Sequence, residues 1–341
     1  MKAVPKPDKL LKPVRSLVLL ALGVILSTLG VGLIARAIDP DRFVRSLATL
    51  DWRWVIAALA GIGLSYVARE QRWAILLQPL VFRRAALWRA LLTGQLLNLL
   101  LPIRIGDVVR SILVGREPSG SFARVFGSVL IEKAWDWLML CLLIVIVAWA
   151  VPLPDWFLLP ARSIGLVALL VLIGFSAVAL TPEDRITRGV AWLDRVLARW
   201  PPRWHTFILT NLHRLLDSLG ALRHQQAIIG AASWSLIIWS LGVISNYAVL
   251  RAYGVDNWIA ATALLVVLMI GVSLPPSIAG VGVYEGLTML TLQFFGLPLE
   301  TALAIGITLH LVVAAPLIIG TAWSWLIMSQ RGRAAAELVD L

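Results

Sequence analysis

Uninterrupted apolar runs of nearly 20 residues constrain this chain more than any other feature of its sequence. A helix needs about 20 apolar residues to cross a hydrocarbon core about 30 Å thick, and there it satisfies its own backbone hydrogen bonds. The apolar share of the chain is 60%, against roughly 45–50% in typical soluble domains. The sequence therefore predicts an all-α fold, a polytopic transmembrane helical bundle.

The apolar runs predict about eight spans within one integral membrane domain, residues 1–341. The first run is longer than the roughly 7–15 apolar residues of a secretory signal, so we interpret it as an uncleaved anchor. We expect a first half at 17–180 and a second half at 227–328. The predicted spans lie at 17–38, 54–68, 86–101, 122–150, 162–180, 227–252, 258–275 and 302–328, with a shorter apolar piece at 284–296.

A stretch of different character, residues 182–226, joins the two halves. Its apolar residues recur at helical spacing, as at Ile186, Val190 and Leu193, and Pro201-Pro202 divides it. The pattern predicts two amphipathic helices that suit the cytoplasmic surface of a membrane. A solvated linker with ordinary amphipathic packing explains the same spacing, and the sequence leaves both interpretations open.

The basic residues predict the orientation of the spans. With a cytoplasmic amino terminus, 23 of the 30 Lys and Arg residues fall in cytoplasmic segments, as the positive-inside rule requires. Both termini are therefore expected in the cytoplasm. The net charge of +11 is spread over short loops and not gathered on one soluble face, so no nucleic-acid partner is expected. The single cysteine, Cys141, says little about the compartment.

Two apolar segments, 86–115 and 258–296, fit this orientation only if each is a re-entrant hairpin that enters the membrane, breaks and returns to the same side. The breaks look alike, because each opens with Leu-Pro, at Leu101-Pro102 and Leu274-Pro275, and places a glycine shortly before an acid. Interrupted segments in corresponding places of two halves indicate an inverted-repeat transporter with a site near the midplane. The competing explanation is that Pro and Gly are common in membrane helices.

Charged side chains at membrane depth cost on the order of 2.5–3.5 kcal/mol each, so a group of them needs an explanation. Glu132 and Asp136 are four residues apart and share a helix face, with Lys133 beside them. A functional site and a plain salt-bridge network between helices both explain this group. A lone histidine on an apolar helix, His310, is more often a packing residue. The candidates are Arg104, Asp107, Arg110, Glu132, Lys133, Asp136, Glu285 and His310.

The two arginines of the first break, Arg104 and Arg110, have the chemistry of anion ligands. A guanidinium meets phosphate oxygens with a planar fork of donors. A helix that restarts after Gly106 adds free N–H groups and a positive dipole end. These residues therefore suit a lipid phosphate, although arginines at the cytoplasmic interface also serve as topology signals.

The second break is rich in glycine. Gly280 and Gly282 allow backbone conformations that are closed to other residues. Exposed backbone at membrane depth is tolerated only where it lines a cavity or packs against protein. We therefore expect Glu285, three residues after Gly282, to face a cavity.

Four stretches carry a family resemblance: "RW" at 72–73, "NLLLPIRIGDVVR" at 98–110, "EKAWD" at 132–136 and "SLPPSIAGVGVYEG" at 273–286. They resemble the flippase-like family typified by the transmembrane portion of lysylphosphatidylglycerol synthases and the multiple peptide resistance factor. Members of that family tend to read Asn-x-x-x-Pro-x-Arg-x-Gly-Glu-x-x-Arg, then Glu-Arg-x-x-Asp, then Pro-x-x-x-Gly-Gly-x-Gly-x-x-Glu. The order and spacing agree over nearly the whole chain.

The resemblance implies a set of substrate-binding residues. Asp107 and Lys133 depart from the family's usual glutamate and arginine but keep the charge, while the third motif holds two glycines in place of three, which leaves the shape of the second loop open. A soluble aminoacyl-transferring domain is not expected, because only a short tail follows Met328. The implied site residues are Asn98, Pro102, Arg104, Gly106, Asp107, Arg110, Glu132, Lys133, Asp136, Gly280, Gly282 and Glu285.

The function expected from these residues is transport without catalysis: the movement of a polar lipid headgroup between leaflets of a bacterial inner membrane. Arg104 and Arg110 would hold the phosphate, and the carboxylates would bind a cationic group or carry protons. The expected lipid is an anionic or aminoacylated phospholipid, or a polyprenyl-linked lipid. No cofactor or metal is expected, and a homo-oligomer is left open.

Two other functions stay open. A membrane glycosyltransferase with a polyprenyl-linked donor would use an acidic pair in the first outer loop, where Asp39-Pro-Asp41 lies. That loop is only about fifteen residues long, which leaves little room for an acceptor. A scaffold that only anchors partner enzymes would tolerate neutralisation of the buried charges.

Overall fold

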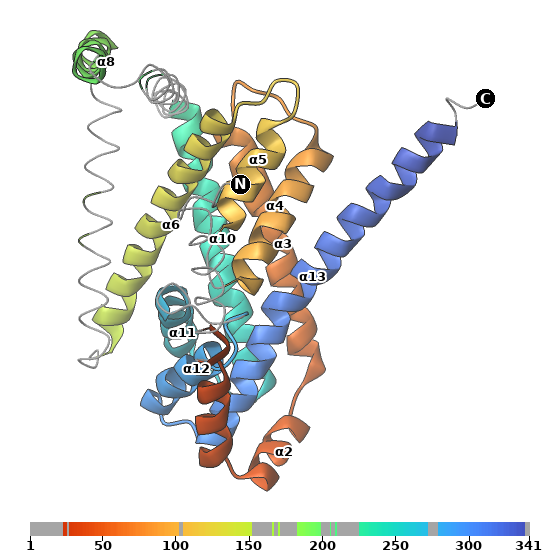
Figure 1. Cartoon of the computed structure of the whole chain (residues 1–341). Helices are drawn as coiled ribbons and strands as arrows, with labels where there is room; N and C mark the ends of the chain where they lie inside the picture. The colour runs from red at the N-terminus through yellow and green to blue at the C-terminus, as the bar shows by residue number, and fades with distance from the viewer. Residues whose placement is uncertain are drawn as a thin grey trace, which may run out of the picture. The chain divides into compact units, whose positions relative to one another are not determined.

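The computed structural model describes residues 23–25, 27–101, 105–151, 166, 170, 183–198, 205, 209, 225–271 and 279–337, with side chains of the last helix as far as Leu326. Every secondary-structure element in these ranges is helical, which confirms the predicted all-α class. A helical stretch at 27–37 precedes the labelled elements (Figure 1). These are α2 (Pro40–Ala48), α3 (Trp52–Leu76), α4 (Arg84–Leu100), α5 (Gly106–Gly115), α6 (Phe122–Ala150), α8 (Glu183–Leu197), α10 (Gln225–Ala252), α11 (Trp258–Gly271), α12 (Val283–Phe294) and α13 (Leu299–Glu337).

Two helices are long and apolar enough to cross a membrane, Gln226–Ala252 within α10 and Leu299–Leu326 within α13. Residues 23–37 and α2 meet the same test together, as a pair bent by 93°. These helices support a membrane helical bundle, whereas the figure of about eight spans stays a prediction. Several predicted features lie outside the described residues: most of the span at 162–180, most of the second amphipathic helix of 182–226, Pro102, Arg104 and Leu274-Pro275.

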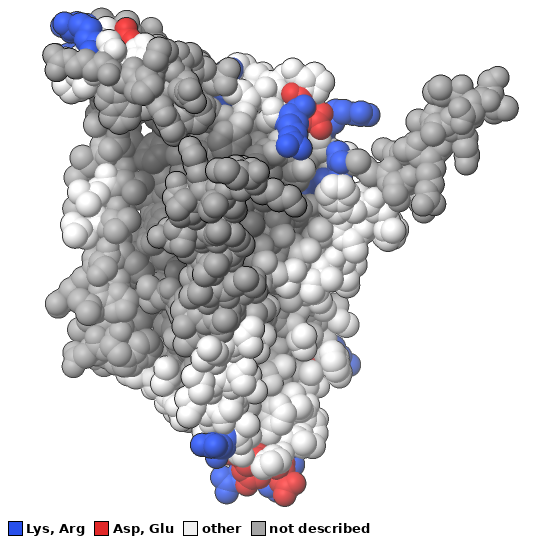
Figure 2. Space-filling view, viewed as in Figure 1, with Lys and Arg blue, Asp and Glu red and all other residues white. Residues whose placement is uncertain are grey.

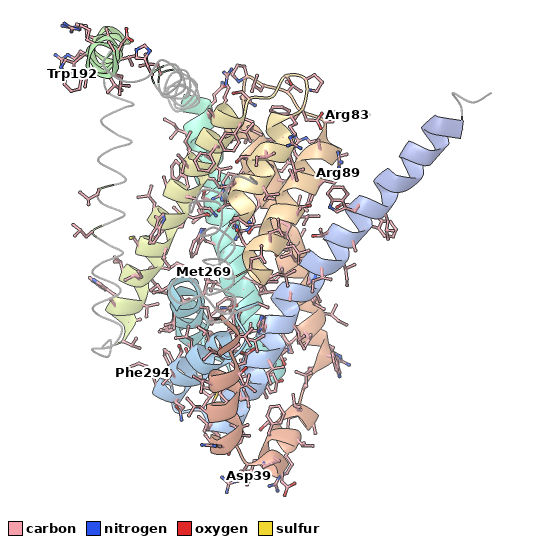
Figure 3. All side chains as sticks on the ribbon, viewed as in Figure 1. Asp39, Arg83, Arg89, Trp192, Met269 and Phe294 are labelled. Atoms are coloured by element: carbon pink, nitrogen blue, oxygen red, sulfur yellow. The ribbon has the colours of Figure 1, made fainter. Side chains whose placement is uncertain are left out.

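Large apolar side chains stand exposed along the long helices. In water such a surface would drive aggregation, whereas in a bilayer the lipid tails cover it. The visible face of the described helices is almost uncharged away from the helix ends (Figure 2). Figure 3 shows charged Arg83 and Arg89 at the beginning of α4. Exposed apolar side chains include Val145 and Trp149 of α6, Leu236 of α10, Met269 of α11, Phe294 of α12, and Leu311 and Ile319 of α13.

The chain divides into two compact units. Unit 1 contains residues 1–63, 94–106 and 241–326, and unit 2 contains residues 64–93, 107–240 and 327–341. The division falls inside α3, α4, α5, α10 and α13, so each of these helices contributes residues to both units.

The core of unit 1 is built on α11 and α12, which lie side by side (Figure 1). Leu264 and Leu268 of α11 are buried with Met289 and Leu292 of α12 and Ile305 of α13. The expected second hairpin corresponds to α11 and α12, which pack against each other as a hairpin requires. Whether this hairpin re-enters the membrane stays a prediction.

Loops that the sequence assigns to one side of the membrane meet within unit 1. Ser46 Oγ of α2 lies 3.2 Å from Thr301 Oγ1 of α13. The backbone N–H of Asp51 donates to the carbonyl of Ala252 at 2.9 Å. The contacts bring together the start of α3, the end of α10 and the start of α13, as a common side requires. That this side is the outer one remains a prediction.

The core of unit 2 surrounds Trp73 of α3, which is fully buried. Its indole N–H donates to Ser128 Oγ of α6 at 3.1 Å, and Leu91 of α4 and Val114 of α5 pack in the same cluster. These helices leave little freedom to the side chains that they carry into the unit's interior.

The amphipathic helix expected at the start of 182–226 forms as α8. Trp192, Arg185 and Arg188 are exposed on it. Its location on a membrane surface stays a prediction.

Candidate functional site

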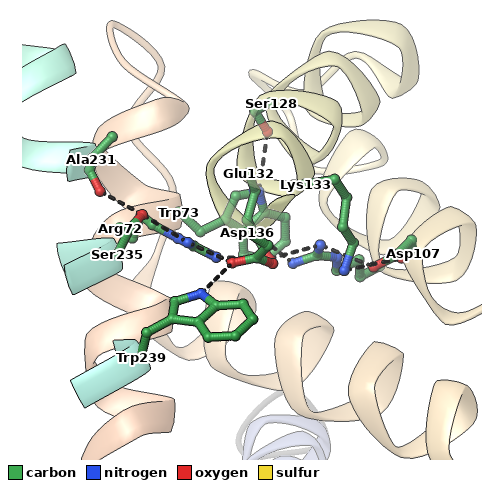
Figure 4. Close-up of polar contacts among 11 residues, drawn as sticks. Arg72, Trp73, Asp107, Ser128, Glu132, Lys133, Asp136, Ala231, Ser235 and Trp239 are labelled. Atoms are coloured by element: carbon green, nitrogen blue, oxygen red, sulfur yellow. Dashed lines mark hydrogen bonds and ion pairs between the residues drawn. The ribbon is translucent and has the colours of Figure 1, made fainter. Parts of the chain in front are cut away.

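Unit 2 holds a group of charged residues that we call the charge cluster: Arg72, Asp107, Arg110, Glu132, Lys133 and Asp136 (Figure 4). Arg72 comes from α3, Arg110 from α5 and Glu132 from α6, and all three are fully buried. Three helices therefore deliver charges to one point, where an unpaired charge would be very costly.

Glu132 lies between two arginines. Its oxygens accept hydrogen bonds from Arg110 Nη1 at 3.0 Å and Nη2 at 3.2 Å, which makes a two-pronged ion pair. Arg72 Nη2 lies 3.4 Å from Glu132 Oε1. Arg110 also lies over the ring of Trp73, 5.0 Å from its centre. The geometry explains why an arginine suits position 110, since an ammonium offers no such fork.

Asp136, one helical turn beyond Glu132, pairs with the other terminal nitrogen of the Arg72 guanidinium. Arg72 Nη1 donates to Asp136 Oδ1 at 2.8 Å and to Ser235 Oγ of α10 at 2.9 Å. Trp239 of α10 approaches the same Asp136 oxygen with its indole N–H at 3.5 Å. The cluster therefore also joins α10 to α3 and α6.

Asp107 and Lys133 form the exposed edge of the cluster. Asp107 Oδ2 lies 3.5 Å from Lys133 Nζ, and the two side chains are 19% and 34% exposed. Asp107 Oδ1 lies 2.9 Å from Arg110 Nη2, an ion pair whose alignment falls short of a hydrogen bond. The side chain of Arg72 is fully buried, whereas that of Lys133 is partly exposed at the surface of the unit. A ligand would therefore approach the cluster from the Lys133 side.

The charges of the cluster cancel. Arg72, Arg110 and Lys133 face Asp107, Glu132 and Asp136, which leaves no net charge to attract a ligand. An anionic group reaches the Nη atoms of Arg110 only by displacing a carboxylate. Within the part of the chain that the structure describes, the buried Nε atoms of Arg72 and Arg110 have no hydrogen-bond partner, so donor capacity remains.

The first break is organised by Asn98 and Gly106. Asn98 Oδ1 on α4 accepts from the N–H of Gly106, the first residue of α5, at 2.8 Å. A side chain at Gly106 would collide with the carbonyl of Gly94, which lies on α4 beside it. The asparagine thus caps the second helix of the hairpin, and the glycine permits the two helices to approach. Pro102 and Arg104 lie outside the described residues.

The second break, in unit 1, is organised by Glu285 and His310. Glu285 Oε2 accepts from the N–H of Gly282 at 2.7 Å, and Glu285 Oε1 lies 2.7 Å from His310 Nδ1. His310 Nε2 lies 2.8 Å from the carbonyl of Ala279, and the imidazole stacks on Tyr284 with ring centres 4.7 Å apart. The sequence favoured a packing role for His310. Its two polar contacts show that it also links α13 to Glu285 and to the loop at Ala279.

The loop before α12 carries positive φ angles at Ala279 (53°), Gly280 (75°) and Gly282 (83°). The N–H of Ala279 approaches the carbonyl of Leu100, at the end of α4, at 3.4 Å. A Cβ at Gly282 would lie 3.3 Å from the Cα of Gly30. Within unit 1, this loop therefore lies against the end of the first hairpin's leading helix and against the 27–37 helix.

The structure places the described site residues in three groups, of which Asn98 and Gly106 at the first break are one. Asp107, Arg110, Glu132, Lys133 and Asp136 meet in the charge cluster, while Gly280, Gly282 and Glu285 belong to the second break. Their roles in substrate binding stay predictions, and the fork of Arg110 is already occupied by carboxylates.

Arg72 is a member of the cluster that sequence reasoning missed as a charge. Arg72 was named only as part of the "RW" stretch of the family resemblance, because the predicted span ended at residue 68. α3 in fact extends to Leu76 and carries Arg72 into the interior. Glu70, buried on the same helix and paired with Arg84 at 2.8 Å, was missed for the same reason.

The acidic pair of the alternative function has a structural use. Asp39 is the N-cap of α2, and its side chain accepts from the N–H groups of Asp41 and Arg42. Among the described residues, no group of three or more His, Cys, Asp and Glu side chains gathers in a way that could hold a metal ion.

Helices with lipid-facing apolar surfaces, a buried charge cluster and two interrupted helical hairpins define a polytopic membrane protein with polar groups in its interior. The chain belongs to the lysylphosphatidylglycerol synthase transmembrane-region family, whose model matches residues 19–320.

Two curated proteins are similar to the chain. Glycosyltransferase AglD of Haloferax volcanii is 26% identical over 92% of this chain and 55% of its own length, so the chain spans about half of that relative. A UPF0104 membrane protein of Methanothermobacter thermautotrophicus is 23% identical over 80% of this chain and 86% of its own length. No solved structure matches the chain.

Proposed function

We propose that this protein is a lipid transporter that moves the polar headgroup of a phospholipid or polyprenyl-linked lipid between the leaflets of a membrane. The observation that carries the proposal is the charge cluster: six ionisable side chains in a membrane family, closed at Arg72 and accessible at Lys133. Charges at membrane depth are costly, and their common use is a path for a polar substrate.

The substrate's phosphate would enter at the exposed edge of the cluster. Lys133 would meet it first, and the phosphate would then take the place of Asp107 beside Arg110. In this exchange Arg110 stays paired, while Asp107, which is partly exposed, would keep Lys133 as its partner, so no buried charge is left uncompensated. Arg104 lies outside the described residues. In this proposal its guanidinium would be a second ligand of the phosphate.

The two interrupted hairpins would supply the route. The loop before α12 touches the end of α4 through Ala279 and Leu100, which supports a meeting of the two breaks. In the proposed arrangement the hairpins re-enter from opposite faces of a bacterial inner membrane, with both termini in the cytoplasm. The protein acts without catalysis, alone or as a homo-oligomer.

The test is lipid movement in vesicles. Purified protein is reconstituted with a headgroup-labelled anionic phospholipid, and a membrane-impermeant quencher reports the fraction that reaches the outer leaflet. We expect Arg104→Lys to slow this movement, because lysine keeps the charge but loses the fork. Arg116→Lys, in the exposed loop after α5, is the matched control and should transport normally. Wild-type protein that moves no lipid faster than empty vesicles overturns the proposal for that lipid.

A glycosyltransferase is the second candidate, because one relative carries that name. The match covers 55% of that protein, so its name alone does not assign the named activity to the shared region. The discriminating variants are Asp39→Asn and Asp41→Asn, which keep the shape of the α2 start. Loss of a cellular glycosylation product in both, with normal expression, would favour the enzyme; unchanged product would remove it. A scaffold would instead tolerate neutralisation of the charge cluster wherever folding survives.

A further inference from the structure

We propose that His310 and Glu285 together bind one proton, and that this proton fastens the loop at 279–282 to α13. Its consequence for lipid movement rests on the proposed function, but the proton site itself does not. The proposal starts from the two contacts of the imidazole, at 2.7 Å to Glu285 Oε1 and 2.8 Å to the carbonyl of Ala279.

The contacts fix the number of protons. A carbonyl oxygen only accepts, so Nε2 must carry a hydrogen and donate it to Ala279. The 2.7 Å contact between Nδ1 and Glu285 Oε1 then requires a second hydrogen between them. That hydrogen belongs either to an imidazolium beside a carboxylate or to a carboxylic acid beside a neutral imidazole. Either way, the pair holds one proton more than a neutral imidazole and a free carboxylate.

Loss of that proton to water breaks one of the two contacts, because a neutral imidazole has a single N–H. If the hydrogen stays on Nε2, two lone pairs face each other at Nδ1 and Glu285. If it moves to Nδ1, two lone pairs face each other at Nε2 and Ala279. A hydrogen bond to a charged carboxylate is about twice as strong as one to a carbonyl. The contact with Ala279 is therefore the one that is lost.

The loop that would be released is under backbone strain. Ala279 is a non-glycine residue at φ 53°, where a Cβ is unfavourable. Such a conformation persists only while its surroundings hold it. The carbonyl of Ala279 is held by His310 and its N–H by Leu100 at the end of α4. Proton loss removes the contact between His310 and the carbonyl of Ala279. The hydrogen bond from Ala279 to Leu100 is then the remaining backbone contact of this residue, and it is weakened.

The surroundings permit a proton to arrive and introduce no competing charge. The side chains of His310 and Glu285 are 13% and 11% exposed. Among the described residues, the titratable group packed against the pair is Tyr284 of α12. Tyr253, at the end of α10, donates to or accepts from Thr308, two residues before His310. Phenols are uncharged at neutral pH, so both leave the charge balance of the pair unchanged.

The experiment measures backbone hydrogen exchange of the loop as a function of pH in the full-length protein. The reporting amides are Ala279, Gly282 and Tyr284, each of which donates a hydrogen bond within or beside the loop. Exchange of α11 in the same sample serves as the internal reference for the direct effect of pH. We expect protection of the loop relative to α11 to be about tenfold lower at the high-pH end of the series than at the low-pH end, as a hydrogen bond is lost.

Glu285→Gln gives the decisive contrast. The amide of glutamine donates to Nδ1 of a neutral imidazole and its oxygen accepts from Gly282, so both contacts form without an extra proton. We expect this variant to keep the loop protected at both ends of the pH series. His310→Ala removes the contact with Ala279 and should leave the loop unprotected at both. An equal pH dependence in wild type and Glu285→Gln, or none in wild type, overturns the proposal.

The lipid assay separates this proposal from the proposed function. If lipid moves in vesicles and its rate loses its pH dependence in Glu285→Gln, the proton site controls the transporter. If the loop responds to pH while no lipid moves, the proton site stands and the transport proposal fails.

Discussion

The charge cluster and the Glu285–His310 pair solve the same physical problem in different ways. In the charge cluster, cations and carboxylates from three helices cancel each other, with two-pronged contacts at 3.0 and 3.2 Å at its centre. At the second break, the carboxylate of Glu285 on α12 and the imidazole of His310 on α13 hold a loop with three positive φ angles. The first arrangement needs its buried members, Arg72, Arg110 and Glu132, to stay folded, whereas the second depends on a single proton. We therefore expect the cluster to stabilise the fold and the pair to control a moving part.

The largest contrast should come from the same substitution at both places. Glu132→Gln leaves Arg72 and Arg110 buried without their shared carboxylate, and breaking a buried ion pair in this way costs about 3–5 kcal/mol. Glu285→Gln can keep both of its hydrogen bonds, so its free energy of unfolding at neutral pH should stay near that of wild type. Thermal unfolding of the detergent-solubilised proteins measures both.

The control for this contrast is Glu117→Gln, the same chemical change in the loop between α5 and α6. It should unfold like wild type. If Glu285→Gln lowers the melting temperature as much as Glu132→Gln does, both regions stabilise the fold and the distinction between them is wrong.

A smaller loss is expected where the first hairpin closes. Gly106→Ala places a Cβ against the carbonyl of Gly94, a backbone atom that cannot rotate away. We expect destabilisation of about 3 kcal/mol, at the upper end of overpacking costs. Gly63→Ala in α3, where a Cβ meets nothing within 4 Å, is the matched control and should be neutral or slightly stabilising. Equal melting temperatures for the two variants would show that α4 and α5 are not closely packed at this point.

The second hairpin offers a matched glycine pair within α12 and its cap. Gly282 has φ 83° and lies against Gly30, so Gly282→Ala should destabilise the protein by about 2 kcal/mol. Gly286, one turn later in the helix, has open space for a Cβ, and Gly286→Ala should stabilise it by about 0.5–1 kcal/mol. Opposite shifts in melting temperature support the observed break, and shifts of the same sign contradict it.

Much of this architecture follows from sequence pattern. Apolar runs placed both ends of α6 and α10 and the beginning of α13 within three residues of their observed bounds, although α13 continues to Glu337, well past the predicted end at 328. The Pro and Gly interruptions placed both breaks. A run ends, however, at its first charge. This is why Arg72 was left outside its helix, although α3 continues to Leu76.

Partners are harder to predict than positions. The spacing of Glu132 and Asp136 showed that they share a face, but nothing in α6 alone indicates that Arg72 of α3 and Ser235 of α10 complete the group. Likewise His310 is separated from Glu285 by 25 residues, and only the packing of α12 on α13 brings them together. Ion pairs between distant helices depend on the tertiary arrangement, which local periodicity does not encode.

The smallest effect on stability should occur at the exposed edge of the cluster. Lys133 lies 3.5 Å from Asp107 and is 34% exposed, and ion pairs of this kind contribute about 0–1 kcal/mol. Lys133→Gln should therefore unfold close to wild type. If the edge receives a lipid phosphate, the same variant should slow the movement of anionic lipid in vesicles, because the first cation on the path is gone. Lys133→Arg, which restores charge and a donor fork, should recover that movement. If transport is unchanged in Lys133→Gln, the cluster, including its exposed edge, only stabilises the packing of the helices. The substrate site would then have to be sought at the second break.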